Sequence, residues 1–254
     1  MSDLKEKIWL WGQKPGAHHF DYGLPGENKM TPLEGLSFFG VDKLCRVKMG
    51  REASDSFYDD PYLGAPAKKL CLSLIGSGGE VPEPDMEPIL TLAKDDPRIV
   101  SAVMDDFVSK ARMEAFTPEI LEGFKAKLHN TLDRPLDLWS VIYEVDVEKP
   151  IVERARVFDV TTFWIWKGEN FAQQEAYIKK IQEIIDGRRL MLGIYMYDYG
   201  NKKQLTDEQM RRQLDIVGEK LATGEAEGAI ICSNCIADLG FSAVDITLDW
   251  LDKL

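Results

Sequence analysis

Two adjacent carboxylic acids, Asp105 and Asp106, end an apolar, β-rich run of this sequence, and Glu144 and Asp198 end two similar runs. Carboxyl groups held in different surroundings release their protons at different pH values, so one can donate a proton while its partner accepts one or attacks. These four residues are therefore the candidate catalytic groups. Asp105 or Asp106 would be the acid or base, and Asp198 or Glu144 the partner carboxylate.

Aromatic and polar side chains occupy the ends of the same runs and of neighbouring ones. Flat apolar rings suit the C–H faces of a sugar, while carboxylates, amides and amines suit its hydroxyl groups. The candidate binding residues are Trp11, Gln13, His18, Lys48, Glu80, Tyr143, Trp164, Trp166, Lys167, Tyr195, Tyr197 and Asn234. The expected ligand is a small carbohydrate, and this chemistry needs no cofactor.

Eight short runs rich in β-branched and aromatic residues predict the strands that would position these groups. They span residues 7–13, 43–49, 69–75, 98–106, 136–144, 156–166, 189–198 and 227–233. Helical patterns separate most of them, and strands that alternate with helices pair in parallel through right-handed crossovers. Eight such units in 254 residues predict a single-domain (β/α)8 barrel. An open doubly wound sheet is the alternative, with its ligand at a switch point.

Capping residues mark several helix ends. Thr31, Thr117 and Thr206 suit N-caps, and Gly187 and Gly224 suit helix stops. One helix is expected to start at 31, and others to cover 84–94, 117–130, 147–155, 170–186, 206–223 and 242–254. Residues 50–67 are rich in Asp, Pro and Gly, so the helix after the second strand is expected to be short or missing.

The two ends of the strands differ in character. The residues that lead into the strands are charged: Lys5, Lys68, Arg98, Arg156, Arg188 and Glu227. The carboxylates and rings lie at the carboxyl ends, where barrel enzymes place their active sites. Because neighbours on a strand alternate, only one of Asp105 and Asp106 is expected to face the axis, and we favour Asp105.

The paired acids also have a structural interpretation. Asp105 and Asp106 could cap the next helix, or form a salt bridge with Lys167 or Lys48. Two acids at the end of a buried strand cost free energy without a partner, which favours a functional pair or such a bridge.

Other candidates have structural alternatives as well. Residues 197–201 could form a simple turn, and Trp164 and Trp166 could fill the core. His18 could lie on a loop surface, and Glu144 could belong to a salt bridge.

The cysteines and glycines favour packing over chemistry. Cys45 and Cys71 lie inside apolar runs, where they serve as small buried hydrophobes. Residues 232–235 form a lone C-x-x-C, without the second pair that a zinc site needs. The glycine-rich residues 73–79 fit neither phosphate-binding pattern and predict a flexible rim loop, although their amides could bind an anion.

A net charge of −12 disfavours binding to nucleic acids and to anionic membranes. No apolar run approaches the ~20 residues of a membrane helix, and the first residues lack the apolar core of a signal peptide. The chain as given is therefore expected in the cytoplasm.

Three segments together resemble glycoside-hydrolase-like (β/α)8 barrel proteins: 103–107 (VMDDF), 164–167 (WIWK) and 197–201 (YDYGN). The best-known glycosidase barrels place an acid after the fourth strand and often a nucleophile after the seventh. Asp105 or Asp106 and Asp198 hold those places here. The chain lacks the Asn-Glu pair of the large retaining clan and the D-x-x-D-x-D-x-E run of chitinase-like barrels. The resemblance thus implies an uncharacterised branch.

A glycosidase acting on a small or terminal sugar is the leading hypothesis. One alternative is a metal-dependent sugar isomerase, epimerase or lyase on the same barrel. Its Mg²⁺ or Mn²⁺ would be held by carboxylates among Glu80, Asp105, Asp106, Glu144 and Asp198. The other alternative is a non-catalytic carbohydrate-binding barrel.

Overall fold

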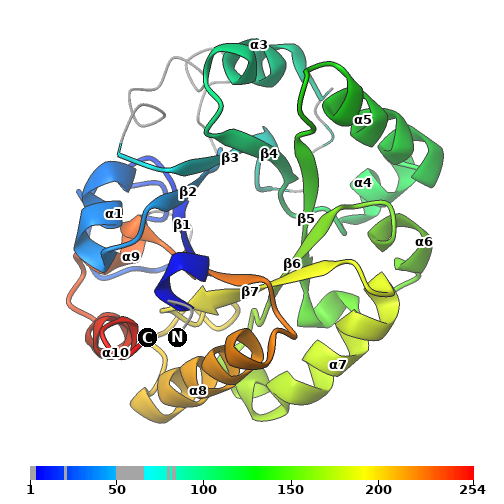
Figure 1. Ribbon diagram of the computed structural model, residues 1–254. Coiled ribbons are helices and arrows are strands. Elements are labelled where there is room, and N and C mark those ends of the chain that lie inside the picture. Colours follow the sequence, from blue (N-terminus) through cyan, green and yellow to red (C-terminus); the bar gives the residue numbers. More distant parts are fainter. Residues whose placement is uncertain (1–3, 20–21, 50–65, 79–80, 82–83) are drawn as a thin grey trace.

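The strands close into a parallel barrel in a computed structural model that describes residues 4–19, 22–49, 66–78, 81 and 84–254. They follow one another around the barrel in chain order, and the last pairs with the first (Figure 1). Their bounds are β1 Ile8–Gly12, β2 Lys43–Arg46, β3 Lys69–Ile75, β4 Ile99–Met104, β5 Asp137–Tyr143, β6 Val160–Trp164, β7 Arg189–Tyr195 and β8 Gly228–Cys232. The predicted (β/α)8 barrel is confirmed, and the open-sheet alternative is wrong.

Helices surround the strands (Figure 1). Their bounds are η1 Leu4–Lys7, α1 Pro32–Phe39, α3 Glu87–Asp95, α4 Lys110–Ala115, α5 Pro118–Asn130, η3 Glu144–Asp146, α6 Val152–Ala155, η4 Gly168–Gln173, α7 Gln174–Ile185, α8 Asp207–Thr223, α9 Asn234–Ala237 and α10 Ser242–Leu251, where η marks a 3-10 helix. The helix expected over 147–155 is confined to α6. Short α4 and α9 were not predicted. Residues 50–65, where a helix was expected to be short or missing, lie outside the described part.

Local hydrogen bonds explain why capping residues in the sequence predicted where helices begin. The side chain of Thr31 accepts from the backbone N–H of Glu34, whose carboxylate accepts from the Thr31 N–H in return. Thr206 and Gln209 form the same reciprocal box at the start of α8. The stop of α7 differs slightly from prediction, because Asp186 takes the left-handed cap conformation at φ 51° just before Gly187.

Large aromatic side chains fill the inside of the barrel. Trp9 of β1 meets Trp139 of β5 edge-on at 5.1 Å between ring centroids, and Trp11 meets Trp164 of β6 at 5.3 Å. These pairs span the interior, because β5 and β6 lie across the barrel from β1. Gly193 of β7 makes room for one indole: a Cβ there would lie 1.9 Å from Cε3 of Trp164.

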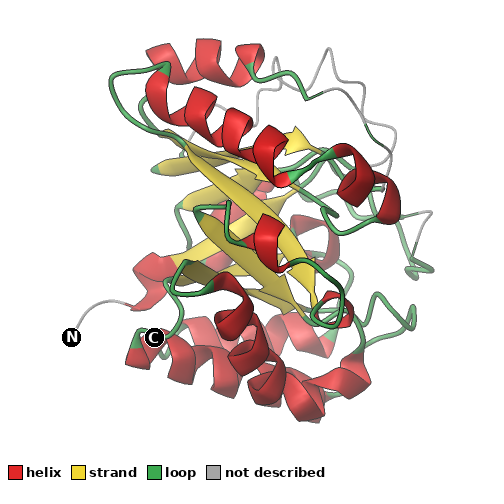
Figure 2. Cartoon of the chain, turned by 90° about the vertical axis from the view of Figure 1, so that its right-hand side faces the viewer, coloured by secondary structure: helices red, strands yellow, loops and turns green. Residues whose placement is uncertain are grey.

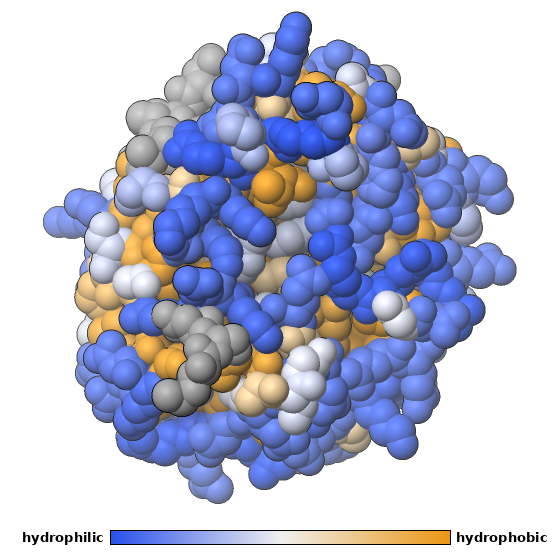
Figure 3. All heavy atoms as spheres, viewed as in Figure 1, coloured by the Kyte–Doolittle hydropathy of each residue, from blue (hydrophilic) through white to orange (hydrophobic). Residues whose placement is uncertain are grey.

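The face where the strands begin is polar. In the side view of Figure 2, η1 and the C-terminus lie at this end of the barrel, and Figure 3 shows hydrophilic side chains over much of it. Salt bridges tie strand starts together: Lys68–Asp42 at 2.6 Å joins the starts of β3 and β2, and Arg189–Asp137 at 2.6 Å joins the start of β7 to that of β5. The charged residues that lead into the strands therefore belong to this face, as the sequence predicted.

The cysteines are all free and buried. Cys45 and Cys71 are register neighbours on β2 and β3 and are fully enclosed, which confirms the packing prediction. Among the described residues, no helix has both the length and the apolar character to cross a membrane.

Candidate functional site

A cavity of about 50 Å³ opens at the carboxyl end of the strands. The strand ends and the loops that follow them contribute lining side chains from all eight βα units, and most of these side chains are aromatic. The lining residues are Trp11, Gln13, His18, Tyr22, Met49, Ser77, Asp105, Asp106, Val141, Tyr143, Trp164, Trp166, Tyr195, Tyr199 and Cys232. The predicted rim therefore contains a cavity that is rich in rings and holds two carboxylates.

Asp105 follows the last residue of β4 and is 4% exposed. Its backbone N–H donates to the carbonyl of Ile75 at 3.0 Å, which extends the pairing with β3. The guanidinium of Arg112 donates to the carbonyl oxygen of Asp105 and, at 2.8 Å, to that of Gly76. Burial, together with the neighbouring charge of Asp106, raises the pKa of Asp105 well above its ordinary range, against a smaller opposing effect of Arg112. Asp105 therefore keeps its proton to a higher pH than an ordinary aspartate does.

Asp106 is held differently. The hydroxyl of Tyr143 donates to its Oδ1 at 2.7 Å, and the backbone N–H of Gly78 donates to its Oδ2 at 2.8 Å. Both donors stabilise a negative charge on this carboxylate. The two neighbouring acids therefore sit in unlike environments: Asp105 is buried, whereas Asp106 accepts hydrogen bonds from Tyr143 and Gly78.

The expectation that only one of these acids could face the axis is wrong, since both line the cavity. Strand alternation stops at Met104, and Asp106 has a left-handed φ of 42°. This turn brings its carboxylate to the same side as that of Asp105. The glycine-rich segment has a part in this arrangement, because Gly78, at φ 108°, aims its N–H at Asp106.

Two tyrosines stand next to the acids as proton donors. Burial, then the charge of Asp106, raises the pKa of Tyr143 well above its ordinary range. Burial, then the thiol of Cys232, does the same to the pKa of Tyr195. Both hydroxyls therefore stay protonated and can donate hydrogen bonds to a bound polar group.

The rings form one continuous wall. Trp164 and Tyr195 lie 4.8 Å apart, Tyr195 and Tyr199 4.7 Å, and Tyr199 stacks on Trp166 at 5.7 Å with 19° between the planes. Trp166 in turn meets Tyr143 edge-on at 5.4 Å. Trp164 is 1% exposed, whereas Trp166 is partly exposed. Trp164 therefore both fills the core and lines the cavity, and Trp166 is accessible as a stacking surface.

His18 is buried beside Tyr199, whose hydroxyl lies 3.0 Å from Nδ1 of the imidazole. Burial lowers the pKa of His18 to about 3, so the ring is neutral at ordinary pH. Cys232 lies 3.8 Å from the same hydroxyl, and burial raises the pKa of its thiol. Both residues line the cavity wall, where burial favours the neutral imidazole and the protonated thiol.

The structure brings nine of the predicted residues to the cavity: Trp11, Gln13, His18, Asp105, Asp106, Tyr143, Trp164, Trp166 and Tyr195. It places six others outside the lining: Lys48, Glu144, Lys167, Tyr197, Asp198 and Asn234. Glu80 lies outside the described residues.

Glu144 and Asp198 are kept from the cavity by their own hydrogen bonds. The carboxylate of Glu144 accepts from the backbone N–H of Trp166 at 2.7 Å and from Nδ2 of Asn170 at 2.8 Å. That of Asp198 accepts from the N–H and Nδ2 of Asn201, at 3.1 and 2.9 Å. Each buried acid thus fastens a neighbouring loop, and the expected partnership with Asp105 is not formed. The simple-turn interpretation of 197–201 fits Asp198.

The remaining residues outside the lining make hydrogen bonds away from the cavity. Asn234 clasps the backbone of Gln13 through two hydrogen bonds of 2.9 Å. Tyr197 donates to the carbonyl of Tyr22 at 2.9 Å. The carbonyl of Lys48 accepts from Ser77 at 3.3 Å, and Lys167 is exposed with its N–H bound to Glu144. A salt bridge between Lys167 and the paired acids is not formed.

Several lining residues were not among the sequence candidates: Tyr22, Met49, Ser77, Val141, Tyr199 and Cys232. Alternation along strands would have found two of them, because Val141 shares a face of β5 with Tyr143, and Cys232 ends β8. Tyr22 and Tyr199 come from loops, where no periodic pattern applies.

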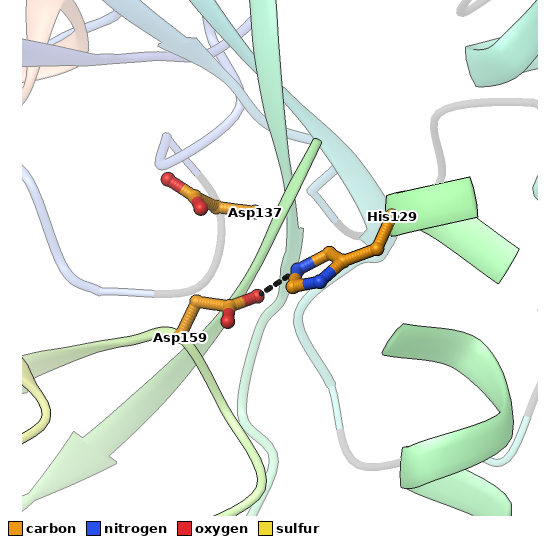
Figure 4. A group of neighbouring side chains, drawn as sticks. All are labelled: His129, Asp137 and Asp159. Carbon is orange, nitrogen blue, oxygen red and sulfur yellow. Dashed lines mark hydrogen bonds and ion pairs between the residues drawn. The ribbon is translucent and has the colours of Figure 1, made fainter. Parts of the chain in front are cut away.

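The described residues hold one group of three potential metal donors (Figure 4), which lies where β5 and β6 begin, at the end of the barrel opposite the cavity. It comprises His129, Asp137 and Asp159. Cations already occupy its acids: Lys125 lies 2.9 Å from Asp159, and Arg189 2.6 Å from Asp137. The donor set fits an ion-pair network that joins α5 to the starts of β5, β6 and β7 better than it fits a metal ion. The carboxylate set expected for a metal at the rim is also divided, because Glu144 and Asp198 lie outside the cavity.

Comparison with solved structures finds similar barrels. The chain matches a GH113 β-1,4-mannanase with a TM-score of 0.56 at 11% identity, covering 100% of both chains. It matches an endo-β-N-acetylglucosaminidase from Cordyceps militaris with a TM-score of 0.54 at 12% identity, covering 97% of this chain and 90% of the other. BpGH50 matches with a TM-score of 0.50 at 10% identity, covering 97% and 75%.

No family model matches the sequence, and no curated protein matches it. At these identities the likeness establishes the fold. The chain is a (β/α)8 barrel like those of glycoside hydrolases, as the resemblance implied.

Proposed function

We propose that this protein is a glycoside hydrolase in which Asp105 is the general acid and Asp106 the anionic partner. The observation that carries the proposal is the pairing of a desolvated carboxyl group with a carboxylate bound by two donors, in a ring-lined cavity at the strand ends. A glycosidic oxygen leaves as an alcohol only if an acid protonates it, and an acid whose pKa is raised retains its proton near neutral pH.

The walls suit a sugar. Trp166 presents a partly exposed indole at the cavity, against which the C–H face of a pyranose can stack. Gln13 and Ser77 supply polar groups for hydroxyls. The neighbours named β-1,4-mannanase and endo-β-N-acetylglucosaminidase share this scaffold, which supports the proposal at the level of the fold.

A panel of methyl α- and β-glycosides, whose alcohol leaves only when an acid protonates it, tests the proposal when assayed with the wild type and with Asp105→Asn. Loss of general acid catalysis is expected to lower kcat by roughly 10²–10⁴-fold on the substrate that is turned over. Asp133→Asn is the matched control, because Asp133 is an exposed aspartate outside the cavity. Its kcat is expected to equal that of the wild type.

Three outcomes contradict the proposal. Undiminished turnover by Asp105→Asn would remove Asp105 as the acid. Sugar binding without turnover of any glycoside would favour the non-catalytic barrel. Activity that depends on added Mg²⁺ or Mn²⁺ would favour the metal-dependent alternative.

A further inference from the structure

The two carboxylates of the cavity are consecutive residues at the end of one strand. An acid and a nucleophile, or an acid and a base, must flank the scissile bond from opposite faces of the sugar, at about 5–5.5 or 6.5–9.5 Å between carboxyl groups. Asp105 and Asp106 approach from the same side, and the N–H of Asp106 donates to Oδ1 of Asp105 at 2.8 Å. They do not form a flanking pair.

The facing wall holds no carboxylate among the described lining residues. Across the barrel from β4 stand rings and the thiol of Cys232, which burial keeps protonated. Glu144 and Asp198 could have served there, but each is held by hydrogen bonds to its own neighbourhood. Within the part of the chain that the structure describes, no lining residue is therefore placed to act as the nucleophile.

We infer that the substrate supplies it: the geometry points to a 2-acetamido-2-deoxy-hexoside whose acetamido and leaving groups are 1,2-trans, as in a β-linked N-acetylhexosamine. This inference rests on the proposed glycosidase function and names its substrate class. A 2-acetamido oxygen can reach C1 only from the face opposite the leaving group, so the 1,2-trans relation is required. Substrate-assisted hydrolysis of this kind needs an acid and an anion but no protein nucleophile.

The dimensions of the cavity fit this group. At about 50 Å³ it has room for about three to five water-sized groups, which matches an acetamido substituent and is too small for a pyranose ring. The ring then stacks at the mouth, with its C2 substituent pointing inward. Trp164 and Tyr195 offer apolar surface to the methyl group, and the Tyr195 hydroxyl can donate to the carbonyl oxygen.

The proposed reaction has two steps, and each proton and each bond is accounted for in both. The Asp105 carboxyl gives its proton to the glycosidic oxygen as the C1–O bond breaks. The acetamido oxygen bonds to C1, and the carboxylate of Asp106 takes the amide proton, which leaves a neutral oxazoline. Water then gives a proton to the Asp105 carboxylate and bonds to C1 as the C1–O bond of the oxazoline opens, while Asp106 returns the proton to nitrogen. The product is a hemiacetal with retained configuration.

The test compares 4-nitrophenyl 2-acetamido-2-deoxy-β-D-glucoside and its galacto epimer with the corresponding β-glycosides that carry a 2-hydroxyl. The acetamido substrates are expected to be cleaved and the hydroxyl substrates to be cleaved at least about a hundredfold more slowly. Replacing N-acetyl by N-trifluoroacetyl weakens the attacking oxygen and is expected to lower kcat about tenfold or more. Proton NMR of the first product should show the β-anomer.

A second measurement is independent of turnover. The sugar thiazoline, which imitates the oxazoline, is expected to raise the Tm of the wild type and of Asp133→Asn, and to do so much less with Asp106→Ala. Equal cleavage of hydroxyl and acetamido substrates, with no effect of fluorine, would overturn the inference and leave the proposed glycosidase function standing. Failure to cleave any glycoside, together with no thiazoline binding, would overturn both.

Discussion

Replacing Gly193 by alanine tests the packing that shapes the cavity. A Cβ at this position would lie 1.9 Å from Cε3, 2.1 Å from Cδ2 and 2.6 Å from Cζ3 of Trp164. Carbon atoms in contact prefer about 3.5–4.0 Å, so the indole must move by about 1.6–2.1 Å. The methyl group therefore cannot be absorbed without a shift of a side chain that is 1% exposed.

The indole has little freedom to move. Its Nε1 donates to Oγ1 of Thr162 at 2.8 Å, and its faces and edges meet Trp11 and Tyr195. Overpacking a core costs about 1–3 kcal/mol, and loss of the hydrogen bond adds about 0.5–1.5 kcal/mol. We expect Gly193→Ala to lower the free energy of unfolding by about 3 kcal/mol. At about 2–4 °C per kcal/mol for a chain of this size, the Tm falls by roughly 6–12 °C.

Differential scanning calorimetry and urea unfolding measure the effect. Gly218→Ala, in the middle of α8, is the control, because the nearest atoms to a Cβ there belong to the Trp250 indole and lie 3.4 Å or more away. Alanine in a helix interior is expected to stabilise by about 0.4–1 kcal/mol. The double variant Gly193→Ala/Trp164→Leu should recover part of the loss, because the smaller side chain leaves space. A Tm of Gly193→Ala within about 2 °C of the wild type would refute the packing argument.

Three further predictions concern single side chains. The carboxylate of Glu144 accepts from two backbone N–H groups and one side-chain amide. Urea unfolding of Glu144→Gln should therefore show a free energy of unfolding lower by about 1–3 kcal/mol. An unchanged free energy of unfolding would mean that the carboxylate does not fasten this loop. Because the pKa of His18 is about 3 when folded and 6.5 is its ordinary value, the unfolded chain binds an extra proton between these pH values. The free energy of unfolding of the wild type should therefore fall as pH falls through this window. At pH 4 the loss should be roughly 3 kcal/mol relative to His18→Phe. Equal pH slopes of the unfolding free energy in both proteins would contradict the burial of a neutral ring. The pKa of Asp105 is raised from 3.8, so its contribution to stability is fully present below pH 3.8 and is lost as pH rises through the raised value. Asp105→Asn should accordingly gain stability relative to the wild type as pH rises. Thermal unfolding at several pH values would show this gain. A difference in Tm that stays constant with pH would argue that Asp105 is ionised throughout.

The sequence alone determined the barrel and the composition of its rim. Alternating apolar runs and reciprocal caps such as Thr31 with Glu34 are local features, because each depends on residues a few positions apart. The placement of the acids after β4 and of the rings after β6 and β7 followed from strand order alone. Nine of the expected residues line the cavity for this reason.

Only the tertiary structure decided which of the acids remain available. Asp105 and Asp106 both reach the cavity because the chain turns at φ 42° under hydrogen bonds from Tyr143 and Gly78, which belong to other βα units. Glu144 and Asp198 also follow strands in the sequence, as Asp105 and Asp106 do. In the structure, however, N–H groups of nearby loops donate hydrogen bonds to their carboxylate oxygens. A carboxylate at a strand end binds the nearest donors, and those donors come from segments whose positions are set by the closed barrel.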